Sequence, residues 1–206
     1  MEKKAVITGD IAKFTSLSSG KRQALVQETE QYLQSILTST EAAAMFRGDS
    51  YQILLDTPKR ALITSIQLIC WFRKRPEIPG GLGTRISIGV GRISYKGETV
   101  LHSDGPAFHH SGRNFDLLES NTYLSINTGD EKKDQNMHII LNFINKYIEK
   151  WKPQQAEVIY LHLKGLNQQA IAQELSISQP SVNSRLKSAG WREIDPALNY
   201  ILSIIN

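Results

Sequence analysis

The side chains with the plainest chemistry in this sequence lie between residues 179 and 192, where polar residues follow a short helical pattern. Glutamine and asparagine can pair with the edge of adenine and arginine with that of guanine, whereas Lys187 and Arg192 suit backbone phosphates. We therefore expect this segment to contact the major groove of double-stranded DNA. The residues expected to make these contacts are Gln179, Ser181, Asn183, Ser184, Arg185, Lys187 and Arg192.

Residues 167–190 have the pattern of two short helices joined by a tight turn, the helix-turn-helix that would position such a recognition helix. The small Ala172 falls where the two helices must touch. Ser178 can cap the second helix, and Pro180 suits its first turn. The apolar residues that would fix the crossing angle are Leu175, Ile177, Val182 and Leu186. The alternative is a three-helix bundle that packs on something else without binding DNA.

Three short segments of this region resemble the promoter-reading end of sigma factors and LuxR-type response regulators: Ile171-Ala172, Leu175-Ser176-Ile177-Ser178 and Ser181-Val182. Ser176 stands where glycine is usual in the turn, and Ser181 stands for threonine. A module with so few cations would bind DNA modestly by itself. A homodimer would help, because it presents two recognition helices about 34 Å apart.

The composition fits a globular protein with one domain of ordinary size and a second, small one: 206 residues, 40% hydrophobic and 21% charged. The formal net charge of +4 divides equally between the segments before and after residue 134, so it singles out neither as the DNA-binding part. The first apolar run stops at Gly9-Asp10, too short for a signal peptide, and no run of about 18 apolar residues occurs. These features predict a soluble, cytoplasmic protein without a membrane partner. A single cysteine, Cys70, excludes internal disulfides and predicts a buried thiol.

The first 128 residues alternate strand-like and helix-like patterns in the order β-α-β-β-α-β-α-β. Strands are expected at 5–8, 43–47, 50–55, 85–94 and 123–126, and helices at 21–38, from Thr57-Pro58 onward and at 105–119. Gly89 and Gly91 leave one face of the fourth strand open to something that lies close to its backbone. This order predicts an α/β fold, a mixed sheet with helices packed on it in the ferredoxin-like manner.

The polar residues 129–136 predict a linker, and the chain beyond them is helical in pattern. We therefore expect two domains, an α/β domain over residues 1–128 and an all-α domain over residues 137–206 that contains the helix-turn-helix.

Four segments of the front domain occur in the order and spacing of the SatD family, which this chain resembles from about residue 4 to residue 120. They are Val6-Ile7-Thr8-Gly9-Asp10-Ile11, Arg47-Gly48-Asp49-Ser50-Tyr51-Gln52, Arg85-Ile86-Ser87-Ile88-Gly89 and Asp104-Gly105-Pro106-Ala107-Phe108. That family also tends to carry a helix-turn-helix tail. The resemblance implies this architecture more than it implies an activity.

The same landmarks look like those of class III nucleotide cyclases. That resemblance implies that Asp10 and Asp49 bind Mg²⁺ or Mn²⁺ with a nucleotide triphosphate, and that Arg113 stabilises the transition state. Two positions depart from the cyclase pattern, because His109 replaces the asparagine that orients the ribose and Met45 replaces the lysine that reads the base. The metal pair is thus present, while the base-reading residues are not.

Each of these residues also has a plain structural role open to it. Asp10 can cap a helix and Asp49 can serve a turn. His109 and His110 can be contacts for a phosphate or base, metal ligands, or half-buried helix residues, and Arg113 can be a surface cation.

Three functions remain compatible with the sequence. The first is a DNA-binding transcriptional regulator whose cyclase-like domain dimerises and senses a nucleotide. The second is a metal-dependent nucleotidyl cyclase or related phosphoryl transferase that its helix-turn-helix targets, which Met45 and His109 argue against. The third is an interaction module that contacts RNA polymerase or another protein.

Overall fold

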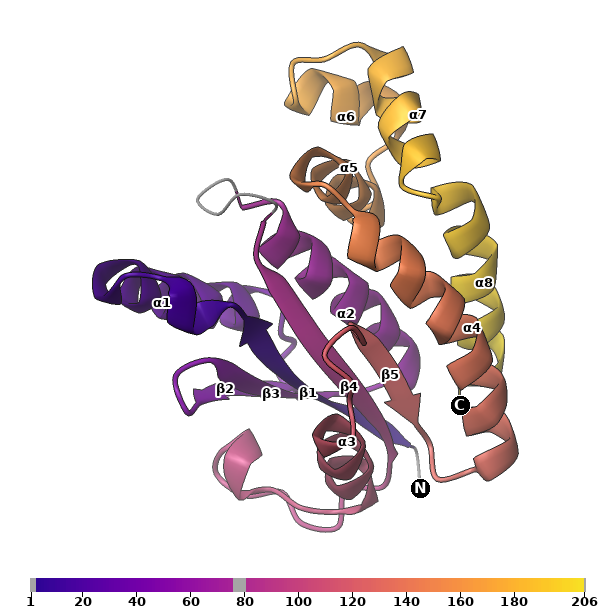
Figure 1. The fold of residues 1–206 in the computed structure, drawn as a ribbon. Helices are drawn as coiled ribbons and strands as arrows, with labels where there is room; N and C mark the ends of the chain where they lie inside the picture. Colours follow the sequence, from indigo (N-terminus) through magenta and orange to yellow (C-terminus); the bar gives the residue numbers. More distant parts are fainter. Residues whose placement is uncertain (1–2, 76–80, 206) are drawn as a thin grey trace.

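The computed structural model describes residues 3–75 and 81–205, which form a five-stranded sheet with helices on both faces (Figure 1). The strands lie in the order β2-β3-β1-β4-β5. Every neighbouring pair is antiparallel except β4 and β5, which are parallel. The strands are β1 (Lys4–Ala12), β2 (Ala42–Phe46), β3 (Ser50–Leu55), β4 (Gly83–Gly91) and β5 (Leu124–Asn127). The expected α/β fold with a mixed sheet is confirmed.

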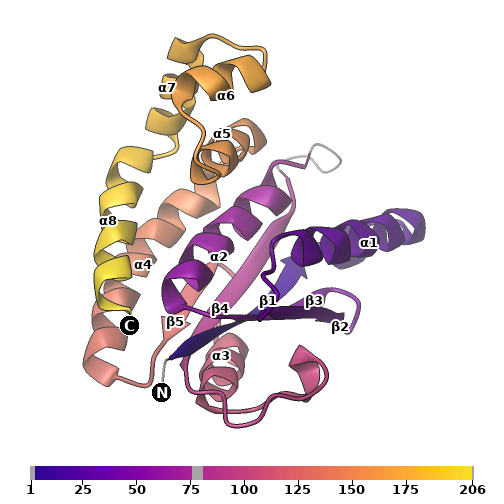
Figure 2. The same ribbon diagram turned by 180° about the vertical axis from the view of Figure 1, so that it is seen from behind.

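Helices α1 and α2 cover one face of the sheet and α3 covers the other (Figure 2). Helix α4 runs beside β5, and α6 and α7 lie at the end of the molecule away from α3. The helices are α1 (Ser19–Ser35), α2 (Pro58–Arg73), α3 (Pro106–Asp116), α4 (Glu131–Lys150), α5 (Pro153–Leu163), α6 (Gln168–Glu174), α7 (Gln179–Ser188) and α8 (Trp191–Ile204), with 3-10 segments η1 (Phe14–Ser16) and η2 (Val100–His102).

Strand β1 is longer than the expected run 5–8 because it pairs with β4 along its whole length and with β3 over residues 5–10. Asp10 lies opposite Ser50 of β3 and Arg85 of β4, inside the ladder rather than beyond its end. The hairpin between β2 and β3 is tight, as expected, but its left-handed residues are Arg47 (φ 54°) and Gly48 (φ 83°), not Gly48 and Asp49.

The two faces of the sheet differ in character. On the α1 and α2 side, Ile7, Ile53 and Ile88 are fully buried in the large apolar core. On the α3 side, Val6 and Leu54 belong to a much smaller apolar cluster, and polar side chains such as Thr8 and Ser87 also lie on this face. Cys70 of α2 is fully buried, as expected, and this burial raises the pKa of its thiol.

The helices after α4 share one apolar core with the sheet rather than enclosing a core of their own. Helix α2 lies between the two parts, and its Trp71 stacks on Tyr32 of α1 with ring centroids 4.6 Å apart. Tyr160 of α5 lies next to Tyr32 at 6.3 Å, and Gln67 of α2 donates to the carbonyl of Leu163. A separate C-terminal domain is therefore not confirmed.

The polar residues expected as a linker mostly belong to α4. This helix begins at Glu131, and the carboxylate of Asp130 caps it by accepting from the Lys133 amide at 3.1 Å. Asp134 accepts from the Thr128 amide at 2.8 Å, which fixes the turn after β5. Residues 131–136 are thus helical because acidic side chains suit the first turn of a helix, where amides are free to donate.

Candidate functional site

Small residues in the SatD-like segments let larger groups pack closely on both faces of the sheet, with Tyr51 in the large core on the α1 and α2 side and α3 on the other side. A Cβ on Gly9 would lie 2.4 Å from the ring of Tyr51, so the second segment packs over the first only because residue 9 is glycine. A Cβ on Gly89 would lie 2.1 Å from the carbonyl oxygen of Ala107, so α3 can approach β4 closely. The expectation that Gly89 admits close packing is confirmed, and the packed element is α3.

A chain of hydrogen bonds links the sheet to α3. The Ser111 hydroxyl donates to Thr8 Oγ1 at 2.7 Å, and Asn114 Nδ2 donates at 2.9 Å to the hydroxyls of Ser87 and Ser125. These bonds join β1, β4 and β5 through one helix, so they satisfy polar groups that the packing removes from water.

Asp10 faces Arg85 rather than open solvent. Arg85 Nη2 lies 2.5 Å from Asp10 Oδ2, and Arg85 Nε lies 3.2 Å from Oδ1. The side chains of Asp10 and Arg85 are 19% and 28% exposed, respectively. Apart from the opposite charges, nothing in the sequence predicts this ion pair, because the register that places residue 10 opposite residue 85 depends on the strand order.

Asp49 lies beside Asp10 in the fold, because its carbonyl accepts from the Ile11 amide at 2.9 Å. Its carboxylate is half-buried and accepts from the Ser50 hydroxyl at 3.2 Å. The structure thus places Asp10 within β1 and Asp49 in the turn before β3, next to each other in the fold.

The residues around these aspartates do not fit the two-metal site of a cyclase. Arg85 occupies both oxygens of one carboxylate, and the described residues contain no group of three or more His, Cys, Asp or Glu side chains placed to hold a metal ion. Divalent ions in phosphoryl transfer need several free oxygen ligands.

The other cyclase-like positions do not converge on this pair. Met45 of β2 packs against the large core, where an apolar side chain belongs. His109 is exposed and its Nε2 lies 2.7 Å from the Asp104 carboxylate, whereas His110 is half-buried and bonds the Val90 carbonyl through Nδ1 at 2.8 Å. Arg113 is an exposed side chain in the last turn of α3.

The segment predicted as a helix-turn-helix forms α6, a short turn and α7. Ala172 is buried between the helices, and its carbonyl accepts from the Ile177 amide at 3.0 Å. Ser178 Oγ caps α7 by accepting from the Ser181 amide at 3.3 Å. Ser176 occupies the left-handed region at φ 52°, which explains why glycine suits this turn better.

Most of the residues expected to face outward from α7 do so. The exposed members are Gln179, Asn183, Ser184, Lys187 and, at the start of α8, Arg192. Ser181 and Arg185 are half-buried, beside the buried Val182 and Leu186. The Arg185 guanidinium lies 3.9 Å from the Glu157 carboxylate of α5.

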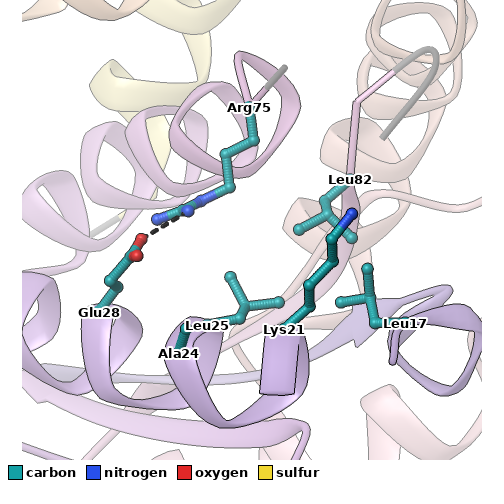
Figure 3. Close-up of a pocket in the computed structure, with 7 residues that line it drawn as sticks. All are labelled: Leu17, Lys21, Ala24, Leu25, Glu28, Arg75 and Leu82. Carbon is teal, nitrogen blue, oxygen red and sulfur yellow. Dashed lines mark ion pairs between the residues drawn. The ribbon is translucent and has the colours of Figure 1, made fainter. Parts of the chain in front are cut away.

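A small apolar pocket lies between α1, the end of α2 and the start of β4 (Figure 3). Leu17, Leu25 and Leu82 line it, and the ion pair between Arg75 and Glu28, at 2.6 Å, closes one side. None of the predicted site residues lines this pocket.

A polar groove that the sequence did not indicate lies between α3, β5 and α4. It is lined by Asn114, Leu117, Ser125, Ile126, Asn127, Glu131, Gln135 and His138, among others. Asparagine, serine and histidine are too common on surfaces for their types alone to reveal such a groove, which exists only because α4 lies along the edge of the sheet.

Comparisons with known proteins agree with part of this description. The SatD family matches residues 6–194, which is more than half of the chain. No curated protein matches the sequence. Among solved structures, the chain is similar to the active GGEEF domain of a diguanylate cyclase from Vibrio cholerae, with 18% identity and a TM-score of 0.36. That similarity covers 43% of this chain and 61% of the other, less than two-thirds of its length. Of the described helices, none is both long and apolar enough to span a membrane.

Proposed function

The chain belongs to the SatD family, and we propose that this member binds double-stranded DNA through α6 and α7 as a regulator of transcription. One observation carries the proposal. Helix α7 presents an exposed row of amide, hydroxyl and ammonium groups at the end of the molecule away from α3 (Figure 1), while Val182 and Leu186 fix its other face in the core. That division suits a helix whose outer face enters the major groove.

The exposed side chains divide by chemistry into two roles. Asn183 and Ser184 would contact base edges, and Lys187 and Arg192 would contact phosphates. Gln179 is oriented by a hydrogen bond of 2.5 Å to Gln168 of α6, which places its amide at the start of the recognition helix. Arg185 would reach the DNA only by leaving Glu157.

Binding by α7 is tested by fluorescence anisotropy on DNA selected from random duplexes, at two salt concentrations. We expect Asn183→Ala to relax sequence preference at one or two positions at a cost of about 1–3 kcal/mol. We expect Lys187→Ala to weaken binding to all sequences and to reduce the salt slope by about 0.9. Lys150→Ala, which removes the same charge from the exposed face of α4, is the matched control. Lack of any salt-dependent binding by the parent protein would refute the proposal.

We further propose that the chain acts as a homodimer, since one α7 offers few cations for phosphate contact. The exposed apolar side chains of α4 support self-association through this helix: Ile139, Phe143 and Tyr147 are 52%, 68% and 38% exposed. Contiguous exposed apolar surface commonly marks an interaction site. This assigns pairing to α4 rather than to the α/β domain alone.

Light scattering coupled to size exclusion tests the pairing. The parent chain should elute with the mass of a dimer, and Phe143→Asp should shift it to the monomer, whereas Asn136→Asp on the same helix should not. A monomeric parent at the highest concentration tested would contradict the proposal, and DNA binding could then still be measured independently.

We also propose that the α/β domain senses a nucleotide, although Arg85 holds both carboxylate oxygens of Asp10, one of the two aspartates that would bind a metal and a triphosphate. The test is incubation of the purified chain with each nucleoside triphosphate and Mn²⁺, with binding measured calorimetrically. Turnover that disappears in Asp49→Ala would instead favour the phosphoryl transferase.

A further inference from the structure

Strand β5 is the edge strand of the sheet, and its outer edge faces α4. The Ile86 amide donates to the Tyr123 carbonyl at 2.9 Å, and Ser87 lies opposite Ser125 in the parallel register. Because parallel strands alternate in the direction of their amides, the N–H and C=O groups of Leu124 and Ile126 point away from β4.

Helix α4 supplies hydrogen-bond partners for the backbone N–H and C=O of Leu124, as a further strand would. Asn145 Oδ1 accepts from the Leu124 amide at 3.0 Å, and Asn145 Nδ2 donates to the Leu124 carbonyl at 3.0 Å. One side-chain amide thus pairs with both backbone groups of one residue. At the other end of the edge, Asp134 accepts from the amides of Thr128 and Gly129 at 2.8 and 3.2 Å.

Ile126 lies between these two anchored positions and has no such partner. Within residues 3–75 and 81–205, no side-chain hydrogen bond reaches its outward N–H or C=O, although the residue is only 5% exposed. Buried backbone groups in native proteins are almost always paired, with protein, water or a ligand. A donor and an acceptor therefore stand side by side without a partner from α4.

The groove described above opens at this position. It provides about 540 Å³ beside Ile126 and continues into a cavity of about 320 Å³ toward Leu117 and Leu141. The side chains that line it are amides, hydroxyls, leucines, His138 and carboxylates, and none of the described lining residues is lysine or arginine. An anion would lie beside Glu131 and Asp134 without a cation, so a phosphate does not suit this groove.

We propose that this groove binds an uncharged planar heterocycle with an N–H donor next to a carbonyl acceptor, such as the base of uridine or guanosine. The ligand carbonyl would accept from the Ile126 amide, and the ligand N–H would donate to the Ile126 carbonyl. This repeats the pairing that Asn145 makes with Leu124 one step along the strand.

The walls of the groove suit the flat faces of such a ring. Leu117, which is 81% exposed, supplies apolar surface, and Asn114 lies at the junction of the two cavities. His138 and Asn142 are hydrogen-bonded to each other at 3.0 Å on the α4 side, which fixes that wall. This site does not require DNA binding, so it goes beyond the proposed function and can fail or succeed independently of it.

The decisive comparison uses ligands that differ only at the donor. Calorimetric titration of the full chain with uridine and guanosine should give measurable binding, and 3-methyluridine and 1-methylguanosine, which lack the N–H, should bind at least about tenfold more weakly. Equal binding of methylated and unmethylated ligands would overturn the proposed pairing. If neither uridine nor guanosine bound, the proposed site itself would be overturned.

Variants and a spectroscopic readout locate the site. Gln135→Trp places a large side chain in the groove and should weaken uridine binding at least about tenfold, whereas Asn199→Trp on the exposed side of α8 should leave it unchanged. In the unmodified chain, uridine should shift the ¹⁵N-amide resonance of Ile126 and not that of Leu124. Unchanged binding in Gln135→Trp, or an Ile126 resonance that does not move, would refute the assignment even if another variant failed to fold.

Discussion

Arg85 holds Asp10 by both carboxylate oxygens, across two antiparallel strands that place the two residues directly opposite each other. The hydrogen bond to Asp10 raises the pKa of the Arg85 guanidinium, so the arginine keeps its charge at any pH at which the protein is folded. A bidentate pair of this kind is stronger than an ordinary surface ion pair. Asp10 is therefore neutralised by Arg85 of the same chain rather than by a metal ion.

This pairing predicts how the protein responds to divalent ions. Mn²⁺ should leave the melting temperature of the parent chain unchanged, because Asp49 alone offers too few free oxygens. Arg85→Ala frees Asp10 next to Asp49, and Mn²⁺ should then raise the melting temperature by a few degrees, equivalent to about 1 kcal/mol. Differential scanning fluorimetry with Mn²⁺ measures both, and Asp10→Ala in the Arg85→Ala background should remove the gain. Stabilisation of the parent by Mn²⁺ would show that the ion displaces Arg85.

The contact between β4 and α3 gives a second prediction, on stability. Gly89→Ala should lower the free energy of unfolding by roughly 3 kcal/mol or more, because the new Cβ would lie 2.1 Å from the Ala107 carbonyl and 2.2 Å from the Ser111 amide, and neither backbone can move alone. Gly112→Ala in α3 is the matched control. Apart from its chain neighbours and the backbone of its own helix, no atom lies within 4 Å of its Cβ position, so alanine should stabilise α3 by up to about 1 kcal/mol. Urea unfolding measures the stability of both variants. Similar effects of the two substitutions would contradict the close approach of α3 to β4.

The sequence predicted those features that depend on local pattern. The order of strands and helices, the caps at Thr57 and Ser178 and the close packing at Gly89 all follow from residues within one element. The pairing of Asp10 with Arg85 does not, because it depends on β4 lying next to β1. The groove at Ile126 could not be predicted for the same reason, since Asn145, which pairs with the neighbouring Leu124, is an ordinary helix residue until α4 is placed along β5.

The prediction of two domains rests on the polar segment 129–136, and a polar segment is compatible with two kinds of structure. Acidic and amide side chains favour a linker because water solvates them, but they equally favour the first turn of a helix. Asp130 and Asp134 take the second role here. The apolar face of the following helix then packs against the sheet. The sequence pattern shows that such a face exists but not which element it packs against.

The turn between α6 and α7 gives a third prediction. Ser176 has φ 52°, a conformation that costs a residue with a Cβ roughly 1 kcal/mol relative to glycine. Ser176→Gly should raise the free energy of unfolding by about 0.5–1 kcal/mol. The greater conformational freedom of glycine in the unfolded chain offsets part of this gain. Ser176→Ala keeps the unfavourable conformation and should give no gain. Chemical denaturation distinguishes them, and equal stability of the two variants would show that the turn is not strained.

Glu41 gives the last prediction, which concerns pH. Its side chain is fully buried and accepts from Arg60 Nε at 2.6 Å and from the amides of Thr38 and Asp56 at 2.9 and 3.2 Å. Burial acts to raise the pKa of this carboxyl, but the hydrogen bonds from Arg60, Thr38 and Asp56 outweigh it and hold the pKa below its ordinary value of 4.5.

A carboxyl whose pKa is lower in the folded state stabilises the protein above its unfolded pKa, and the stabilisation is lost as the pH falls through the folded pKa. The loss of unfolding free energy in Glu41→Gln should therefore be largest near neutral pH and should shrink below pH 4.5. Glu30→Gln, at an exposed position of α1, should show a small difference that does not change with pH. Urea unfolding between neutral and acid pH measures both differences. A cost for Glu41→Gln that stays constant to the lowest pH would mean that the charge of this carboxylate is not what its hydrogen bonds stabilise.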